Sequence, residues 1–497
     1  MDNIIVLTQN LKLESIDKLK SELAGPETLI LSTQFIFENE AKLIDERLGV
    51  QCTYKNFSDI LTDSDWDFCD TKAFSDQQKN VGEYYAAIKT LKNQMIADKV
   101  LSEYACNNKI IVCDDLGLDV NVWISKGFRY IPCEYYHENA SLSTEKSPLI
   151  KKAASKVLSK LSVLKNALTL NIWKTTYKGQ TYLFFGSMNR IGYRCNTEFQ
   201  KASRLENIKA AFYMAFKVWP SNKIIRMSTL HESTSIKLPD IANLNLKLIQ
   251  DGYLPPNYSS KYLLFHGKNI EYYTWDVAGQ ETFKYHHLKS QVMPFRKKLY
   301  LPNPVFPQRV KKVLCVASGA GDWTAVKNRS DEDKMVHAFG KIAAMFPDIE
   351  FVYRCHPVWV HPQHQGVNSI NRVAEYIHWL NLPNFKISCH IPNAVENGKF
   401  VLSYKRTSFE EDLKDVDVVF GEHSISMIDA AFKNILFCSV NVTGRRDFFK
   451  GITAMGFPHC ESIDEISNLL KSINTQAFKD KYEQAIKNYN EMTDREE

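Results

Sequence analysis

Short apolar runs, each followed by an amphipathic or loop segment, recur along this chain in two series. Runs of this length are typical of strands buried on both faces of a parallel sheet, and the stretches between them are typical of crossover helices. The pattern predicts an α/β fold. The predicted strands are Asn3 to Leu7, Thr28 to Leu31, Lys109 to Cys113, Tyr182 to Phe185, Lys261 to Phe265, Val313 to Ala317, Glu350 to Tyr353, Asn384 to Ile387, Val416 to Phe420 and Ile435 to Ser439.

The chain is long enough for more than one domain. Its 497 residues correspond to about three units of about 150 residues, or to two large α/β domains. The two series of strands favour two Rossmann-like halves. Between them runs Leu301-Pro-Asn-Pro-Val-Phe-Pro307, whose three prolines favour an extended linker. We therefore place domain boundaries at 1–300 and 301–475, followed by a C-terminal helix and tail over 476–497.

Composition excludes several classes of protein. Apolar residues make up 44% of the chain and charged residues 24%, which is ordinary globular usage and excludes wholesale disorder. Basic residues number 62 and acidic residues 57, so the net charge of +5 is no nucleic-acid signature. We expect no nucleic-acid partner.

Cysteines and hydrophobic segments indicate the compartment. The 11 cysteines form no CxxC pair, and several lie in apolar runs, which predicts reduced thiols in a cytoplasmic protein. The N-terminus lacks the features of a signal peptide, and no apolar run is long enough to span a bilayer. Residues 146–168 place apolar side chains opposite lysines, which predicts a packing helix or, alternatively, a peripheral contact with the inner face of the membrane.

Three turns in the second half follow predicted strands at their carboxyl ends, where open α/β sheets bind ligands. The first turn contains Ser318, Gly319, Gly321 and Asp322. Its glycines permit close backbone approach to a ligand, and Asp322 would project a carboxylate toward it. The alternative is a tight turn in which Asp322 caps the next helix.

The second turn ends a strand with Arg354, His356 and Pro357. A histidine at a strand end donates a hydrogen bond to a phosphate oxygen and, when protonated, offsets its charge. The alternative is an ordinary surface histidine. His356, His361 and His364 also suggest zinc, but they have no cysteine or carboxylate at ligand spacing, so we predict no metal site.

The third turn carries Glu422 and leads into a helix that begins near Ser424, with Ser426 in its first turn. Hydroxyls and free N–H groups at a helix start bind phosphate, whereas the alternative makes Ser424 a simple N-cap. Asp415 and Asp417 are spaced like the Asp-x-Asp of some metal-dependent transferases. They begin an apolar strand, however, so we do not assign them a metal.

Together these features resemble the donor half of GT-B glycosyltransferases, over residues 301–475. The His-Pro pair followed by a serine-containing helix start is similar to the pair in CMP-sugar transferases, including sialyl-, polysialyl- and Kdo-transferases. The resemblance implies two Rossmann-like domains facing an interdomain cleft, with the acceptor bound by 1–300 and the C-terminal helix packed back on that domain. It implies donor binding by Ser318, Gly319, Gly321, Arg354, His356, Pro357, Glu422, Ser424 and Ser426.

Within this group the chain most resembles retaining β-Kdo transferases of bacterial surface polysaccharide synthesis, which have an aspartate nucleophile in the first donor-domain loop. The resemblance makes Asp322 that nucleophile and His356 the group that stabilises the CMP leaving group. It implies transfer of Kdo, or a related ulosonic acid, to capsule, O-antigen or lipopolysaccharide, on a glycan or lipid-linked glycan acceptor and without a cofactor. The alternatives are a CDP-glycerol-type glycerophosphotransferase, a sialyltransferase, a nucleotide-sugar epimerase, and an inactive glycan-binding subunit.

Two aspartates in the first half are candidates on the acceptor side. Asp115 follows one predicted strand, and Asp276 follows the apolar segment that begins at Tyr272. In an inverting enzyme either would act as the base that deprotonates the acceptor hydroxyl. The alternative for both is a turn residue whose side chain bonds to the backbone.

Overall fold

The structure is a computed structural model of the whole chain. The residues that it describes are 1–7, 13–33, 35–75, 81–112, 118–131, 160–161, 163–165, 168–169, 171–186, 188, 192–218, 223–229, 246–249, 271–285, 289–317, 329–356, 369–388, 394–396, 399–401, 407–422, 424–442 and 449–495.

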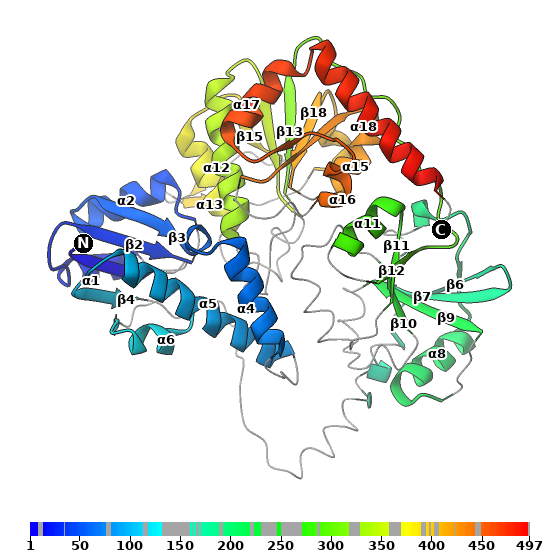
Figure 1. Cartoon of the computed structure of the whole chain (residues 1–497), viewed down its shortest axis with the longest axis horizontal. Helices are drawn as coiled ribbons and strands as arrows, with labels where there is room; N and C mark the ends of the chain where they lie inside the picture. Colours follow the sequence, from blue (N-terminus) through cyan, green and yellow to red (C-terminus); the bar gives the residue numbers. More distant parts are fainter. Residues whose placement is uncertain are drawn as a thin grey trace. The chain divides into compact units, whose positions relative to one another are not determined.

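Within these residues the strands form three larger sheets and one two-stranded hairpin, and the chain divides into two compact units (Figure 1). The first unit contains 1–140, 302–447 and 457–483, and it holds the first and third sheets. The second unit contains 141–301, 448–456 and 484–497, and it holds the second sheet. The stretch 1–300, for which one domain was expected, therefore contributes a separate sheet to each unit.

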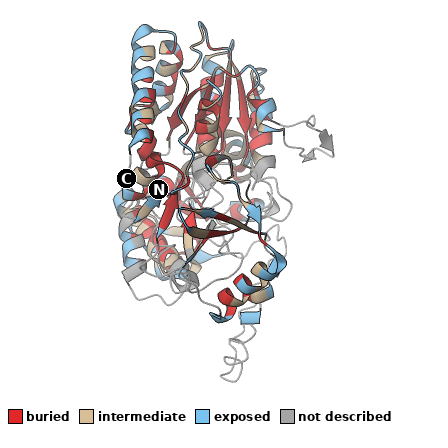
Figure 2. Ribbon diagram, turned by 90° about the vertical axis from the view of Figure 1, so that its right-hand side faces the viewer, coloured by how far each residue is buried: buried red, intermediate tan, exposed pale blue. Residues whose placement is uncertain are grey.

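The first sheet is five-stranded and entirely parallel, in the order β3-β2-β1-β4-β5. This order reverses beside the first strand, as in Rossmann folds. All residues of the two central strands β1 and β2 are buried, and helices α1 and α2 pack on them. Figure 2 shows buried residues, in red, gathered on the strands and on one side of the helices. The elements are β1 (Asn3–Leu7), α1 (Leu13–Lys20), β2 (Thr28–Ser32), α2 (Glu38–Leu48), β3 (Cys52–Asn56), α3 (Phe57–Ile60), α4 (Asp63–Ser75), α5 (Val81–Glu103), β4 (Asn108–Ile111), α6 (Val120–Ser125) and β5 (Arg129–Tyr130).

The third sheet is six-stranded and parallel, in the order β15-β14-β13-β18-β19-β20. Its order is again that of a Rossmann fold, with the reversal at β13. The elements are β13 (Lys312–Val316), α12 (Arg329–Met345), β14 (Glu350–Arg354), α13 (Ser369–Leu380), β15 (Phe385–Ile387), the hairpin β16 (Ala394–Glu396) and β17 (Lys399–Val401), α14 (Phe409–Asp412), β18 (Val418–Gly421), α15 (Ile425–Ala431), β19 (Leu436–Val440), β20 (His459–Cys460) and α17 (Ile463–Ser472).

The second sheet is seven-stranded and mixed, in the order β12-β11-β10-β9-β7-β6-β8. Strand β7 runs parallel to β9 but antiparallel to β6, because a two-residue turn with positive φ at Lys178 and Gly179 joins β6 and β7. The elements are β6 (Ile172–Tyr177), β7 (Gln180–Phe185), η2 (Gly192–Arg194), β8 (Gln200–Lys201), α8 (Arg204–Phe216), β9 (Ile224–Thr229), β10 (Leu246–Ile249), β11 (Tyr272–Thr274), α11 (Val277–Tyr285), β12 (Ser290–Val292) and α16 (Lys450–Thr453).

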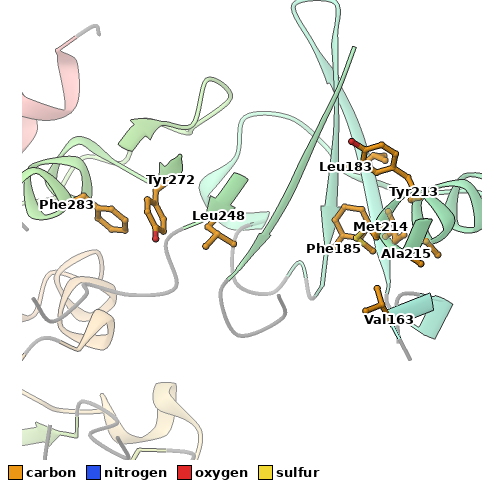
Figure 3. Close-up of a cluster of buried hydrophobic side chains, with 13 residues drawn as sticks. Val163, Leu183, Phe185, Tyr213, Met214, Ala215, Leu248, Tyr272 and Phe283 are labelled. Atoms are coloured by element: carbon orange, nitrogen blue, oxygen red, sulfur yellow. The ribbon is translucent and has the colours of Figure 1, made fainter. Parts of the chain in front are cut away.

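The core of the second unit lies between this sheet and helix α8. Tyr213 and Met214 of α8 lie against Leu183 and Phe185 of β7 (Figure 3). Val163 belongs to the same buried cluster. The end of the predicted amphipathic segment 146–168 therefore contributes to a protein core, and the rest of that segment lies outside the described residues.

Helix α18 (Gln476–Asp494) contributes to both units. In the first unit, the Tyr482 hydroxyl accepts a hydrogen bond from the backbone N–H of Phe437, at 3.0 Å. In the second unit, the Asn490 side chain exchanges hydrogen bonds with the backbone of Leu301, at 2.8 and 2.9 Å. The described helices include none long and apolar enough to cross a membrane.

The two parallel sheets confirm the predicted α/β class with Rossmann-like strand order, which is the construction that GT-B enzymes share. Most predicted strands of these two sheets are present within one or two residues of their predicted ends. The predicted strand Lys261 to Phe265 lies outside the described residues. The antiparallel strand β6 was not predicted.

Candidate functional site

Three strands of the third sheet end at the same level. Val316 of β13 is paired with Arg354 of β14 on one side and with Gly421 of β18 on the other. The loops that follow these strands therefore leave one edge of the sheet together, at the reversal of strand order where such sheets bind ligands. Of the predicted residues on these loops, Ser318, Gly319, Gly321, Asp322 and Pro357 lie outside the described residues, as does Asp115 in the first sheet.

Gly421 makes the junction of β18 with β13 possible. A Cβ atom at this position would lie 2.7 Å from Cγ2 of Val316 and 3.1 Å from its carbonyl oxygen. Contacts this short require the Val316 side chain or the strand ends to shift, so the observed close approach depends on glycine. The end of β18 at Gly421 is thereby held against the end of β13 at Val316.

Ser424 and Ser426 lie at the start of α15 and are partly exposed. Ser424 occupies the N-cap position with extended backbone, φ −72° and ψ 132°, but its side chain makes no capping hydrogen bond to the helix. The alternative, in which Ser424 is a simple N-cap, therefore lacks the side-chain hydrogen bond by which a serine caps a helix. Donor binding by Ser424 and Ser426 stays a prediction.

Arg354 is part of a buried polar network. Its Nη1 donates to Asp412 Oδ2 and, at 3.1 Å, to the backbone oxygen of Thr407. The hydroxyls of Ser388 and Thr407 donate to Asp412 Oδ1, each at 2.6 Å. Arg354 and Asp412 are only 6% and 7% exposed. The Arg354 charge, which was predicted to bind the donor, is balanced by Asp412 of α14, and sequence analysis did not identify Asp412 as its partner.

His356 follows Arg354 by two residues, directly after β14, and is partly exposed. It therefore lies at the same edge as the turn that carries Glu422 and Ser424. Its contact with a donor phosphate stays a prediction.

A chain of hydrogen bonds supports the turn at Glu422. The buried Ser439 hydroxyl donates to the Glu422 carbonyl oxygen at 2.9 Å, and Nδ1 of His459 lies 3.0 Å from the same hydroxyl. Because the Ser439 proton is already directed at Glu422, Nδ1 of His459 must be the donor. Sequence analysis missed both residues. The sequence feature that could have identified Ser439 is its position as the polar last residue of the otherwise apolar strand Ile435 to Ser439.

Asp415 and Asp417 precede β18 and so lie at its amino end, at the opposite edge of the sheet from His356. Asp417 Oδ2 accepts hydrogen bonds from the backbone N–H groups of Lys311 and Lys312, at 2.6 and 3.0 Å. Asp415 has a left-handed φ of 60°. This pair belongs to the junction of two strands, and among the described residues no group of His, Cys, Asp and Glu side chains is arranged to hold a metal ion.

Asp276 has a structural setting in the second unit. Its Oδ1 accepts a hydrogen bond from the Gly279 N–H at 2.7 Å, which caps helix α11. Its Oδ2 lies 3.7 Å from Nη1 of the buried Arg194 and 3.5 Å from the hydroxyl of Tyr489. These contacts match the alternative in which Asp276 is a turn residue. Its role as an acceptor-side base stays a prediction.

The described cysteines form no disulfide. Cys438 and Cys460 lie on neighbouring strands with their sulfur atoms 3.7 Å apart. Burial raises the pKa of the Cys438 thiol well above its ordinary value. The Cys438 thiol therefore stays protonated and unreactive at neutral pH.

Neither a protein-family model nor a curated protein matches the chain. Similar solved structures include a glycosyltransferase from Rickettsia africae, with 12% identity, a TM-score of 0.32, and coverage of 83% of this chain and 90% of that one. A variant of S. aureus TarM, in complex with fondaparinux, α-GlcNAc-glycerol and UDP, has 10% identity, a TM-score of 0.30, and coverage of 98% and 96%. The S. aureus MnaA–UDP complex has 9% identity, a TM-score of 0.27, and coverage of 99% and 92%. TM-scores this low carry no argument about this chain, whose fold class rests on its strand orders.

Proposed function

We propose that this protein is a glycosyltransferase that moves Kdo, or a related ulosonic acid, from a CMP-activated donor to a bacterial surface glycan. The observation that carries the proposal is the common level of Val316, Arg354 and Gly421 at one edge of the third sheet. The loops that resemble the donor site of CMP-sugar transferases all begin at that edge. The choice of CMP and Kdo rests on the sequence resemblance.

In the proposed reaction Asp322 attacks the anomeric carbon of the donor sugar, and the bond to the CMP phosphate breaks. The acceptor hydroxyl then displaces Asp322, so the configuration at the anomeric carbon is retained. His356 and the hydroxyl of Ser424 or Ser426 hydrogen-bond the phosphate as its charge increases. A monophosphate leaving group stabilised in this way needs no bridging metal ion.

Nucleotide release tests the proposal. The full chain is incubated separately with CMP-Kdo, CMP-sialic acid, CDP-glycerol and a UDP-sugar, each with and without excess EDTA. We expect release of CMP from CMP-Kdo, undiminished by EDTA. Release only from CDP-glycerol would instead support a glycerophosphotransferase, and isomerised UDP-sugar without an acceptor would support an epimerase. Loss of activity in EDTA that magnesium restores would contradict the metal-free mechanism.

Asp322→Asn tests the nucleophile. The change keeps the side-chain shape but removes the nucleophilic oxygen, so turnover should fall by several orders of magnitude while CMP binding persists. Mass spectrometry of the trapped wild-type protein should show one added sugar. Near-normal turnover in Asp322→Asn, or a product with inverted anomeric configuration, would rule out the double displacement and favour a base such as Asp115 or Asp276.

A further inference from the structure

A cavity of about 540 Å³ opens on the second unit, between β6 and the segment that leads into β8. Its size is within the range of about 300–1,000 Å³ that is usual for small-molecule sites. None of its lining residues belongs to the candidate donor site. The residues on which the inference rests are Trp173, Asn196, Glu198, Phe199 and Lys297.

Two aromatic rings in the lining are held in place from outside the cavity. The Trp173 Nε1–H donates to the backbone oxygen of Gly186 at 3.1 Å. The Phe199 ring packs edge-to-face on Phe295, with ring centres 5.6 Å apart and planes at 72°. Both aromatic side chains are partly exposed. They provide apolar surface for a ligand at little cost in side-chain entropy.

Among the polar residues of the lining, Asn196 is fixed by two hydrogen bonds to the backbone. The Asn196 N–H donates to the Phe295 carbonyl and its side-chain amide donates to the Arg296 carbonyl, both at 2.8 Å. This arrangement leaves the Asn196 side-chain oxygen as an acceptor. Glu198 and Lys297 are exposed, and neither forms an ion pair with another described residue. Acceptors and donors therefore border the same aromatic surface.

We propose that this cavity binds a neutral oligosaccharide of two or three sugar rings. Sugar rings present apolar C–H faces that suit Trp173 and Phe199, and hydroxyls that suit Asn196, Glu198 and Lys297. A phosphate-bearing ligand fits less well, because the Glu198 carboxylate opposes the attraction of Lys297. A purely apolar ligand would remove water from two charged groups without replacing it.

This inference concerns binding alone, and it stands whether or not the donor proposal is correct. The test uses the full chain and a panel of maltotriose, cellotriose and chitotriose, with affinities measured by calorimetry and tryptophan fluorescence. We expect at least one trisaccharide to bind, and Trp173→Ala to weaken its affinity at least tenfold. Trp379→Ala, which alters a tryptophan 45% exposed in the first unit, is the matched control and should leave the affinity unchanged.

A second variant tests the same cavity in case Trp173→Ala does not fold. The double change Glu198→Gln and Lys297→Met alters two exposed side chains and should weaken the affinity about tenfold with an unchanged melting temperature. The proposal is overturned if no trisaccharide binds, if the double variant binds normally, or if CMP competes with the sugar for Trp173. CMP binding that survives Trp173→Ala keeps this inference separate from the donor site.

Discussion

At the residue scale, Arg354 shows that an arginine at a strand end can either bind a phosphate or pair with a buried carboxylate. The sequence places a cation at a strand end, where it suits a phosphate, and nothing nearby in the sequence identifies a counter-ion. In the structure the counter-ion is Asp412 of α14, whose carboxylate accepts hydrogen bonds from the Arg354 guanidinium and from two hydroxyls. Sequence reasoning could locate the strand end but not a partner 58 residues away.

Removing one member of this buried pair should be costly. Asp412→Ala leaves the Arg354 charge buried without a carboxylate, and we expect the free energy of unfolding to fall by about 3–5 kcal/mol. Urea denaturation measures the change. The control is Asp348→Ala, which breaks the pair with Arg309 at a carboxylate 75% exposed and should cost less than about 1 kcal/mol. Equal losses in the two variants would show that the buried network contributes no more than a surface pair.

His356→Ala should weaken CMP binding by about 1.5–3 kcal/mol, which is the usual contribution of a hydrogen bond to a charged group. Calorimetry measures the change. His378→Ala alters an exposed histidine at the end of α13 and should bind CMP as the wild type does. The donor assignment fails if UDP binds more tightly than CMP, or if both variants bind CMP equally well.

At the element scale, the buried parallel strands could be predicted and the sheet that contains each of them could not. Val313 to Ala317 and the residues that follow Glu350, Phe351 to Tyr353, are continuous apolar runs because both faces of the sheet are covered, so these strands are visible in the sequence. Strand β6 buries only Ile172 and Thr175, which are three residues apart, so it shows neither an apolar run nor the two-residue alternation of a strand. Which strands share a sheet depends on pairings between residues that are far apart in the sequence.

At the same scale, the candidate donor site depends on the close contact between Gly421, at the end of β18, and Val316, at the end of β13. Gly421→Ala should separate the ends of β18 and β13, lowering stability by about 1–3 kcal/mol and weakening CMP binding. Thermal unfolding and calorimetry measure the two effects. Gly192→Ala is the control, because its Cβ would meet only Cε of Met188, at 3.8 Å. Normal CMP binding by a destabilised Gly421→Ala protein would show that the turn does not hold the donor.

At the scale of the whole molecule, side chains far apart in the sequence join the first and third sheets into one unit. Arg372 of α13 forms a bidentate pair with Glu40 of α2, at 2.5 and 2.6 Å, and donates to the backbone oxygen of Phe35 at 2.8 Å. Arg372 and Glu40 look like ordinary charged surface residues in the sequence. For this reason the association of 1–140 with 302–447 could not be predicted, and a single domain over 1–300 was expected instead.

The same contact region makes the stability of the first unit depend on pH. Burial raises the pKa of Glu38, but hydrogen bonds from His337 and Lys341 outweigh it and lower the pKa from 4.5 to about 2. A depressed pKa stabilises the folded state above pH 4.5, and this contribution is lost as the pH falls toward 2. In urea denaturation between these values, Glu38→Gln should therefore lose less stability than the wild type. Glu46→Gln changes an exposed residue of the same helix and should follow the wild type. Identical pH profiles for all three proteins would show that Glu38 does not link this contact region to protonation.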